Sequence, residues 1–480
     1  GKMFKKLLGL SYLAITFHFT PNLQAATFNV TTPAEFQTAL ATAQANGQDD
    51  TINVLAGTYN IGSTLTYDTV ENFNLTLVGA GASTTILDGG KLVQIMNLTG
   101  TGSGDISVSG LTLQNGRNGA VGGLGGALFA NNSADGSITI DWCIVTNSTS
   151  VKNTGGAWIG AENGDLTVTN SSFTHNSCDE GTSDDGCGLY LYFNSETASG
   201  NAIVRNNDIS YNTLNHNPSP IGNCDGAGLM IYHLGTSGPG NSCTIENNTI
   251  NNNLSYEGAA GMSVHLLHQN NTILIRGNTF SGNTAGPLPE GVSIQIYGGG
   301  AHVYCAGGTF TINGNQFLNN SNLDPNGIGG GLSLDALGGT LEMIGNVFSG
   351  NQNSGMGGGA FVFLETDITV ANIVQNLFVN NQAGLTEGSG GGLSLSANIG
   401  ANLINNTFYN NIAAEGGGMT YYAEAPAHVA LLYNEIYRGN TPNAISVFAP
   451  GPVQATYSNI EGGSGETYFG TGCIDLNPLL

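Results

Sequence analysis

The sequence has few charged residues, and very few of them are basic. Of its 480 residues 9% are charged, with nine Lys and Arg against 33 Asp and Glu, which gives a formal net charge of −24. A surface this acidic repels nucleic acid and anionic lipid, so we expect no nucleic-acid partner. It also disfavours strongly acidic polysaccharides, unless cations bridge the two.

A long apolar run and a metal-binding cysteine spacing are also missing. After residue 25, no segment has eighteen consecutive apolar residues, so no transmembrane helix is expected. The seven cysteines include no C-x-x-C pair and no Cys/His spacing typical of structural zinc. An odd number leaves at least one cysteine unpaired in an exported protein. We expect a disulfide among Cys178, Cys187 and Cys224, which lie in two neighbouring loops.

The N-terminal segment has the features of a secretory signal peptide. Lys5 and Lys6 form a basic start, residues 7–19 form an apolar core, and Ala25 is a small residue before a cut near Ala26. We therefore expect residues 1–25 to be a signal peptide and the protein to be extracellular or on the cell surface.

What the sequence does contain is Gly, Asn and short apolar segments. There are 74 Gly, and 40% of the residues are hydrophobic, which is too many for a disordered chain. From residue 123 a unit recurs at intervals of about 27–40 residues, opening with Gly-Gly and closing with Asn-x-Phe/Ile-x-x-Asn. The openings include Gly125-Gly126, Gly155-Gly156, Gly299-Gly300, Gly330-Gly331, Gly358-Gly359, Gly391-Gly392 and Gly417-Gly418. Such a repeat predicts a solenoid whose length variation lies in loops.

Each repeat shows a period of two after its glycines. The residues one and three positions after the second Gly are apolar in nearly every unit, as in Ala157/Ile159 and Leu189/Leu191. Alternation of this kind places them on one face of a strand, here the inside of a tube. We expect the closing Phe or Ile to form a third interior column. The flanking Asn residues can adopt left-handed turns and hydrogen-bond along the stack.

The first hundred residues differ from the repeat. Thr32 suits an N-cap and Pro33 the first helical position, which predicts a helix from there to about Asn46 that covers the open end of the tube. We expect four segments, which are the signal peptide at 1–25, the N-terminal cap and first coils at 26–122, the repeats at 123–445 and a terminal coil at 446–480.

The motifs carry a family resemblance. Gly-Gly-Ala-hydrophobic and Phe-x-x-Asn, as in residues 173–176 and 378–381, resemble the repeats of the polymorphic outer-membrane proteins, which are surface adhesins. The N-terminal block resembles bacterial right-handed β-helix proteins, and residues 458–479 resemble the closing segment of secreted β-helix proteins with variable C-terminal anchors. The resemblance implies an all-β fold, a single-stranded right-handed parallel β-helix with a short N-terminal capping helix. It says less about function, because this fold hosts many activities.

The candidate binding residues lie two and four positions after the second Gly, on the opposite face of the first strand. Many are aromatic, and exposed aromatic ladders suit stacking on sugar rings. They are Trp158, Tyr190, Tyr192, Tyr232, His265, His302, Tyr304, Phe361 and Phe363. The alternative interpretation is that stacked aromatic rings only stabilise neighbouring coils. His265 and His302 could likewise act as a base pair or simply pack.

A second candidate site consists of acidic residues in the long loops. These are Asp179, Glu180, Asp184, Asp185 and Asp225. Carboxylate oxygens could bind Ca²⁺, and two of them flanking a sugar could hydrolyse it. Isolated acids on loops can also be merely solvated. Ca²⁺ is the one cofactor that the pattern suggests.

Three functions fit these observations. The first is an adhesin-like protein that binds a glycan or a component of a host or neighbouring cell surface. The second is a carbohydrate-active enzyme, a polysaccharide hydrolase or lyase. The third is a structural protein that self-associates. We expect binding rather than catalysis, because the sequence has no basic cluster of the kind that lyases use on uronates and no Gly-His-Gly motif of polygalacturonase-type hydrolases.

Overall fold

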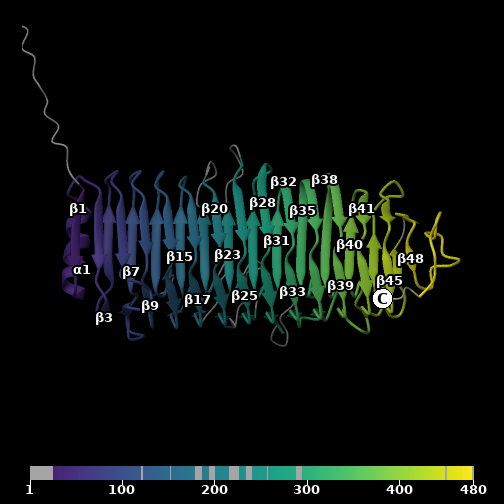
Figure 1. Ribbon diagram of the computed structural model, residues 1–480, viewed down its shortest axis with the longest axis horizontal. Coiled ribbons are helices and arrows are strands. Elements are labelled where there is room, and N and C mark those ends of the chain that lie inside the picture. Colours follow the sequence, from purple (N-terminus) through teal and green to yellow (C-terminus); the bar gives the residue numbers. More distant parts are fainter. Residues whose placement is uncertain are drawn as a thin grey trace, which may run out of the picture.

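The molecule is an elongated stack of coils. The computed structural model describes residues 25–477 apart from 121–122, 152, 179–185, 194–199, 216–225, 234–239, 257, 288–294 and 449–450. Apart from Ala25, the expected signal peptide lies outside the described residues. The described coils form a rod with a helix at its N-terminal end (Figure 1). The interior of the rod is one continuous hydrophobic core that runs from Val30 to Tyr468.

Every strand pairing runs parallel between one coil and the next. In the described part of the chain the strands form three sheets, of 26, 14 and 8 strands. A typical coil contains β15 (Ala157–Ala161) and β16 (Leu166–Thr169) in the largest sheet, then β17 (Ser172–Thr174) and β18 (Ser177–Cys178) in the other two. Each pairs with the matching strand four elements further on, as β15 does with β19 (Leu189–Phe193).

The first strands of the coils stack on one another, and we call their outer surface the first-strand face. They are β4 (Leu65–Thr69), β7 (Met96–Gly100), β11 (Leu128–Asn132), β15, β19, β23 (Leu229–His233), β27 (Met262–Leu266), β31 (Ala301–Cys305), β35 (Leu332–Ile344), β38 (Ala360–Val374), β40 (Leu393–Ala397), β43 (Met419–Tyr422) and β46 (Ile445–Phe448). The long strands β35 and β38 continue through the second position of their coils.

The second and third strands make the other walls. The second strands are β1 (Ala26–Val30), β2 (Asp50–Val54), β5 (Leu75–Gly79), β8 (Ile106–Ser109), β12 (Ile138–Asp141), β16, β20 (Ala202–Arg205), β24 (Ser242–Glu246), β28 (Asn271–Arg276), β32 (Gly308–Asn313), β41 (Ala401–Ile404), β44 (Ala430–Tyr433) and β47 (Val453–Thr456). The third strands are β3 (Gly57–Asn60), β6 (Thr85–Asp88), β9 (Thr112–Gln114), β13 (Ile144–Thr146), β17, β21 (Asp208–Ser210), β25 (Thr249–Asn251), β29 (Thr279–Ser281), β33 (Gln316–Leu318), β36 (Val347–Ser349), β39 (Leu377–Val379), β42 (Thr407–Tyr409), β45 (Ile436–Arg438) and β48 (Asn459–Ile460).

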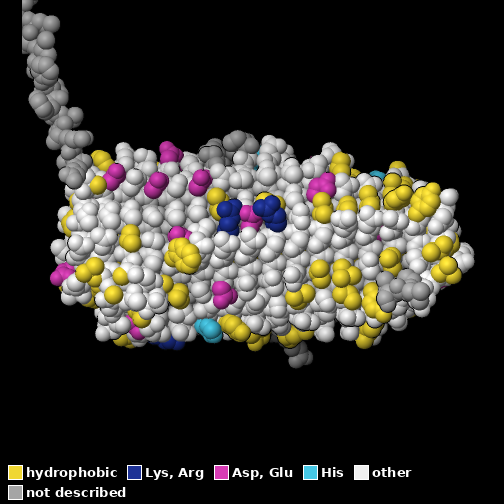
Figure 2. Space-filling view, viewed as in Figure 1, with side chains coloured by type: hydrophobic (Ala, Val, Ile, Leu, Met, Phe, Trp, Pro, Cys, Tyr) yellow, Lys and Arg dark blue, Asp and Glu magenta, His cyan; other side chains and the backbone are white. Residues whose placement is uncertain are grey.

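Among the described residues, a short fourth strand closes eight of the coils. These strands are β10 (Arg117–Asn118), β14 (Thr149–Ser150), β18, β22 (Thr213–Leu214), β26 (Leu254–Ser255), β30 (Thr284–Ala285), β34 (Ser321–Asn322) and β37 (Gln352–Asn353). The face of the rod seen in Figure 2 carries few charged side chains, in line with the composition.

The alternation and the closing Phe place side chains inside the tube as expected. Leu189 and Leu191 are fully buried, and so is the column of closing rings from Phe280 to Phe408. Consecutive rings of that column stack nearly parallel, and the last ring, Phe408, lies 4.4 Å from Tyr437 between ring centroids. The coil spacing of roughly 4.8 Å sets this ring spacing.

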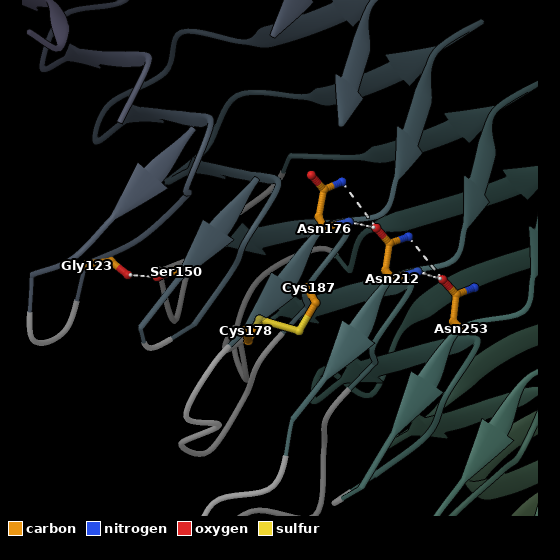
Figure 3. Close-up of a disulfide and its surroundings, with 7 residues drawn as sticks. All are labelled: Gly123, Ser150, Asn176, Cys178, Cys187, Asn212 and Asn253. Carbon is orange, nitrogen blue, oxygen red and sulfur yellow. Dashed lines mark hydrogen bonds between the residues drawn. A yellow bond between two sulfur atoms is a disulfide. The ribbon is translucent and has the colours of Figure 1, made fainter. Parts of the chain in front are cut away.

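Two ladders of buried Asn side chains run along the interior. In the closing ladder, the backbone N and Nδ2 of Asn212 both donate to Oδ1 of Asn253 at 3.0 Å (Figure 3). Nδ2 of Asn212 also donates to the carbonyl oxygen of Phe173. Asn176 makes the same contacts with Asn212. A parallel ladder runs from Asn207 to Asn406. The expected hydrogen bonding along the stack is therefore present, and it satisfies polar groups that the turns bury.

Helix α1 (Pro33–Ala43) covers the N-terminal end. Thr32 is its N-cap, and a capping box joins Thr32 to Glu35. Phe36 and Leu40 are fully buried against the first coils. The helix ends at Ala43 rather than near Asn46, because the chain turns there to enter β2.

One disulfide joins Cys178 to Cys187 (Figure 3), which is one of the pairings expected. Cys143, Cys243 and Cys305 are buried free thiols. Burial raises the pKa of Cys143 to about 12, so this thiol stays protonated and unreactive. Cys224 lies outside the described residues.

Candidate functional site

The first-strand face carries the two outward columns that the repeat predicts. In the column two positions after the second Gly, Trp158 pairs with Tyr190, and further along Ser263 pairs with His302. In the column four positions after it, neighbouring strands bring together Tyr192, Tyr232, His265, Tyr304, Asp335 and Phe363 in that order. These side chains lie outside the tube, and Trp158, Tyr190 and Met230 form an apolar cluster separate from the core.

The outer column is a stack of rings. The ring centroids of Tyr192 and Tyr232 are 6.2 Å apart, those of Tyr232 and His265 6.0 Å, and those of His265 and Tyr304 5.5 Å, with interplanar angles of 14–21°. Because the strands fix the spacing, the rings form a rigid row parallel to the long axis.

The expectation that the whole stripe is exposed is wrong. Trp158, Tyr190, His265 and His302 are buried, with exposed fractions of 3–7%. Rings stacked one coil apart lie within contact distance and cover one another, and Trp158 is stacked on Phe129 at 4.9 Å. The half-buried members that still present a surface are Tyr192, Tyr232, Tyr304, Phe361 and Phe363.

Three polar side chains form a hydrogen-bonded chain across the two columns. Nε2 of His265 lies 3.3 Å from Nδ1 of His302, and Nε2 of His302 lies 3.0 Å from Oδ2 of Asp335. The ring of Tyr297 stacks on that of His302, with ring centroids 4.5 Å apart. The register places the three residues on β27, β31 and β35, one coil after another.

The order of the three side chains in this hydrogen-bonded series determines which nitrogen atoms carry protons. An ionised carboxylate only accepts, so Nε2 of His302 carries the proton shared with Asp335. In a neutral His302 ring, Nδ1 is then the acceptor, and Nε2 of His265 donates to it. Nδ1 of His265 is left with the unshared electron pair. Burial, with a smaller effect from neighbouring His302, holds the pKa of His265 well below its usual range, so this ring is neutral at pH 7.

These groups surround a cavity of about 510 Å³. Four aromatic rings, two Leu side chains, both imidazoles and one carboxylate line it. The lining residues are Tyr232, His265, Leu267, Tyr297, His302, Tyr304, Asp335, Leu337 and Phe363. Mostly apolar walls with a few converging polar groups are typical of a small-molecule or sugar site.

Further hollows follow on the same face towards the C-terminus. One of about 460 Å³ is lined by Phe361, Tyr422 and Phe448 together with Ser and Thr hydroxyls. It shares Glu415 and Phe448 with another of about 830 Å³ at the C-terminal coils. Register pairs Phe363 with Ser396, then Tyr422, then Phe448, so the hollows follow one column of the sheet.

The predicted Ca²⁺ ligands cannot be placed. Asp179, Glu180, Asp184, Asp185 and Asp225 lie outside the described residues. Within the described ranges, no group of three or more His, Cys, Asp or Glu side chains is arranged to hold a metal ion. In the part of the chain that the structure describes, helix α1 is too short to cross a bilayer.

The comparisons with known proteins agree with the architecture. Residues 96–310 match the family model described as a right-handed beta helix region. This protein is a right-handed parallel β-helix. No curated protein matches the sequence.

Two solved structures align with this β-helix at low identity. A mannuronic acid specific polysaccharide family 6 lyase from human gut microbiota is 12% identical, with 88% of this chain and 91% of that chain covered and a TM-score of 0.41. The Agl-KA catalytic domain is 15% identical, with 88% and 65% covered and a TM-score of 0.33.

Part of the cavity lining was not predicted from the sequence. Tyr297 lies three residues before Gly300 and pairs through a bridge with Ile328, which pairs with Met356 at the same place in the next coil. Each of these residues stands three positions before the second Gly of its unit, a place that the period of two after the Gly pair does not include. Asp335 stands in the outward column, but its bond to His302 depends on side-chain direction and not on spacing.

Proposed function

We propose that this β-helix binds a neutral glycan chain outside the cell, with the chain lying along the first-strand face. The observation that carries the proposal is the cavity between Tyr232 and Phe363, where rings held at coil spacing surround a space large enough for a sugar residue. A sugar has apolar ring faces that stack on aromatic rings and hydroxyl groups that bond to imidazole and carboxylate.

The row of hollows supports a polymeric ligand over a single sugar. The outer column from Tyr232 to Phe448 crosses eight consecutive strands of the sheet, roughly 34 Å at 4.8 Å per strand. Each step is comparable in length to one residue of an extended glycan. The net charge of −24, and Glu387 and Glu415 in the lining, favour an uncharged chain.

A double variant, Tyr304→Ala with Phe363→Ala, tests the site. We expect it to lower the affinity for a neutral polysaccharide at least tenfold, because each ring supplies a stacking surface worth on the order of 1 kcal/mol or more. Affinity would be measured by titration calorimetry against a panel of xylan, glucomannan and galactan, with polygalacturonate as the charged comparison.

The matched control is Tyr211→Ala. Tyr211 is also a surface tyrosine, with 52% of its side chain exposed, but it lies at a turn after β21 and outside the cavity. Its loss should leave the affinity unchanged. Equal binding by the double variant and the parent, or tighter binding of polygalacturonate than of any neutral chain, would refute the proposal.

A further inference from the structure

We infer that His265, His302 and Asp335 form a proton relay that hydrolyses O-acetyl esters on the bound glycan. The inference rests on the proposed function, because the cavity must first hold the glycan. All three side chains line that cavity, and two hydrogen bonds connect them in a single chain. His265 would be the catalytic residue, with His302 and Asp335 positioning it and sharing its charge.

The relay moves positive charge away from the buried ring of His265. A buried His265 ring holds a positive charge poorly, since it has lost its water and faces a second imidazole. When Nδ1 of His265 takes a proton, the proton on Nε2 can pass to Nδ1 of His302. The positive charge then lies on His302, whose Nε2 is 3.0 Å from the Asp335 carboxylate. Oriented imidazole and carboxylate pairs of this type are a general arrangement for general-base catalysis.

The lining favours ester hydrolysis over cleavage of the glycosidic bond. Glycosidic hydrolysis uses two carboxyl groups on opposite sides of the bond, whereas the described lining has Asp335 alone, bonded to His302. The same lining includes no Lys or Arg that would neutralise a uronate for elimination. Ester hydrolysis needs one group that takes a proton and later returns it, which a single imidazole can do.

The reaction proceeds in two balanced steps. Nδ1 of His265 takes a proton from water as the water oxygen bonds to the acyl carbon, and the carbonyl electron pair moves onto its oxygen. The tetrahedral intermediate then re-forms the carbonyl, and the bond from the acyl carbon to the sugar oxygen breaks. The sugar oxygen leaves with the electron pair and takes the proton from His265, giving acetic acid and a free hydroxyl group. The phenols of Tyr232 and Tyr304 line the cavity and are suitable donors to the oxyanion.

The test measures acetate release and binding side by side. The probes are acetylated xylan and acetylated glucomannan, each compared with its chemically deacetylated form. The parent protein should release acetate, and His265→Gln should lower kcat at least 100-fold, a much larger loss than any fall in its affinity for the deacetylated chain. The control His175→Gln replaces a histidine that stacks on Tyr211 away from the cavity, and it should match the parent.

Asp335→Asn separates a relay from a structural role. The rate should rise with pH as His265 loses its proton, and removing the carboxylate two hydrogen bonds away removes a group that favours the protonated ring. The variant should therefore have a lower kcat, and its rate should begin to rise at a lower pH than that of the parent protein. The other titratable groups that face the pair are the phenols of Tyr232, Tyr297 and Tyr304. A substitution that only loosened the packing would lower the melting temperature but would not change the pH at which the rate rises.

The outcomes are distinguishable. Binding of the neutral chains without acetate release by the parent would overturn the relay and leave the proposed function standing. Release that persists in a folded His265→Gln variant would also overturn it. Neither binding nor release would remove both conclusions.

Discussion

Replacing Phe378 by alanine is expected to lower the free energy of unfolding by about 3–5 kcal/mol, the range for removing a large ring from a packed core. Phe378 is fully buried, and its ring stacks between Phe348 at 4.8 Å and Phe408 at 4.6 Å. The strands on either side hold the coil spacing, so the walls cannot close on the cavity. The substitution also removes two aromatic contacts.

Leu377→Ala is the control for Phe378→Ala. Leu377 is the preceding residue of β39, points to the opposite side of the strand, and has 36% of its surface exposed. Its truncation should cost less than about 1 kcal/mol. Guanidinium unfolding followed by circular dichroism would measure both variants. Similar costs for the two would mean that the closing Phe column does not hold the coils together.

The sequence was sufficient for the register of the repeat. A side-chain period of two, repeated after every Gly pair, leaves two choices of face, and only one buries pairs such as Ala157 and Ile159. The closing motif likewise identified both the Phe column and the Asn beside it. In the structure the Asn residues have two different roles. Asn351 is buried and hydrogen-bonds along the ladder, whereas Asn319 and Asn380 adopt a positive φ at the turn.

The solvent exposure of the outward aromatic side chains could not be derived from the sequence in the same way. Spacing places Trp158 and Tyr190 on the outside of the tube, but whether a ring meets water depends on the size and tilt of the rings in the neighbouring coils. Phe129 covers Trp158, and Tyr190 meets it edge-on at 6.2 Å. The His265–His302–Asp335 chain was hidden for a related reason, because its hydrogen bonds join two columns that alternation treats as independent.

Glu435 replaces an Asn of the interior ladder, and it is the basis of the second large prediction. Glu435 stands where earlier coils have Asn376 and Asn406, and its Oε1 accepts the backbone N and Nδ2 of Asn406, both at 2.9 Å. Among the described residues, its Oε2 has no hydrogen-bond partner. Burial raises the pKa of Glu435 to about 8, against an ordinary value of 4.5.

The sign of the pH dependence follows from that shift. Between pH 4.5 and about 8 the folded protein holds a proton on Glu435 that the unfolded chain has lost. The stability from this group is therefore fully present below pH 4.5 and is lost as the pH rises towards 8, by up to roughly 1.4 kcal/mol per pH unit. Above that, a buried carboxylate with an unsatisfied oxygen continues to destabilise the last coils.

Glu435→Gln should remove this dependence. Its amide keeps the acceptor for Asn406, carries no titrating proton, and should make the protein more stable than the parent at pH 9 while leaving the two similar at pH 4.5. Glu424→Gln, an exposed change in the same coil, gives the baseline. Because other titrating groups are common to parent and variant, the difference between their unfolding free energies isolates Glu435. A difference that stays constant from pH 4.5 to 9 would show that the pKa of Glu435 is not raised in the folded protein.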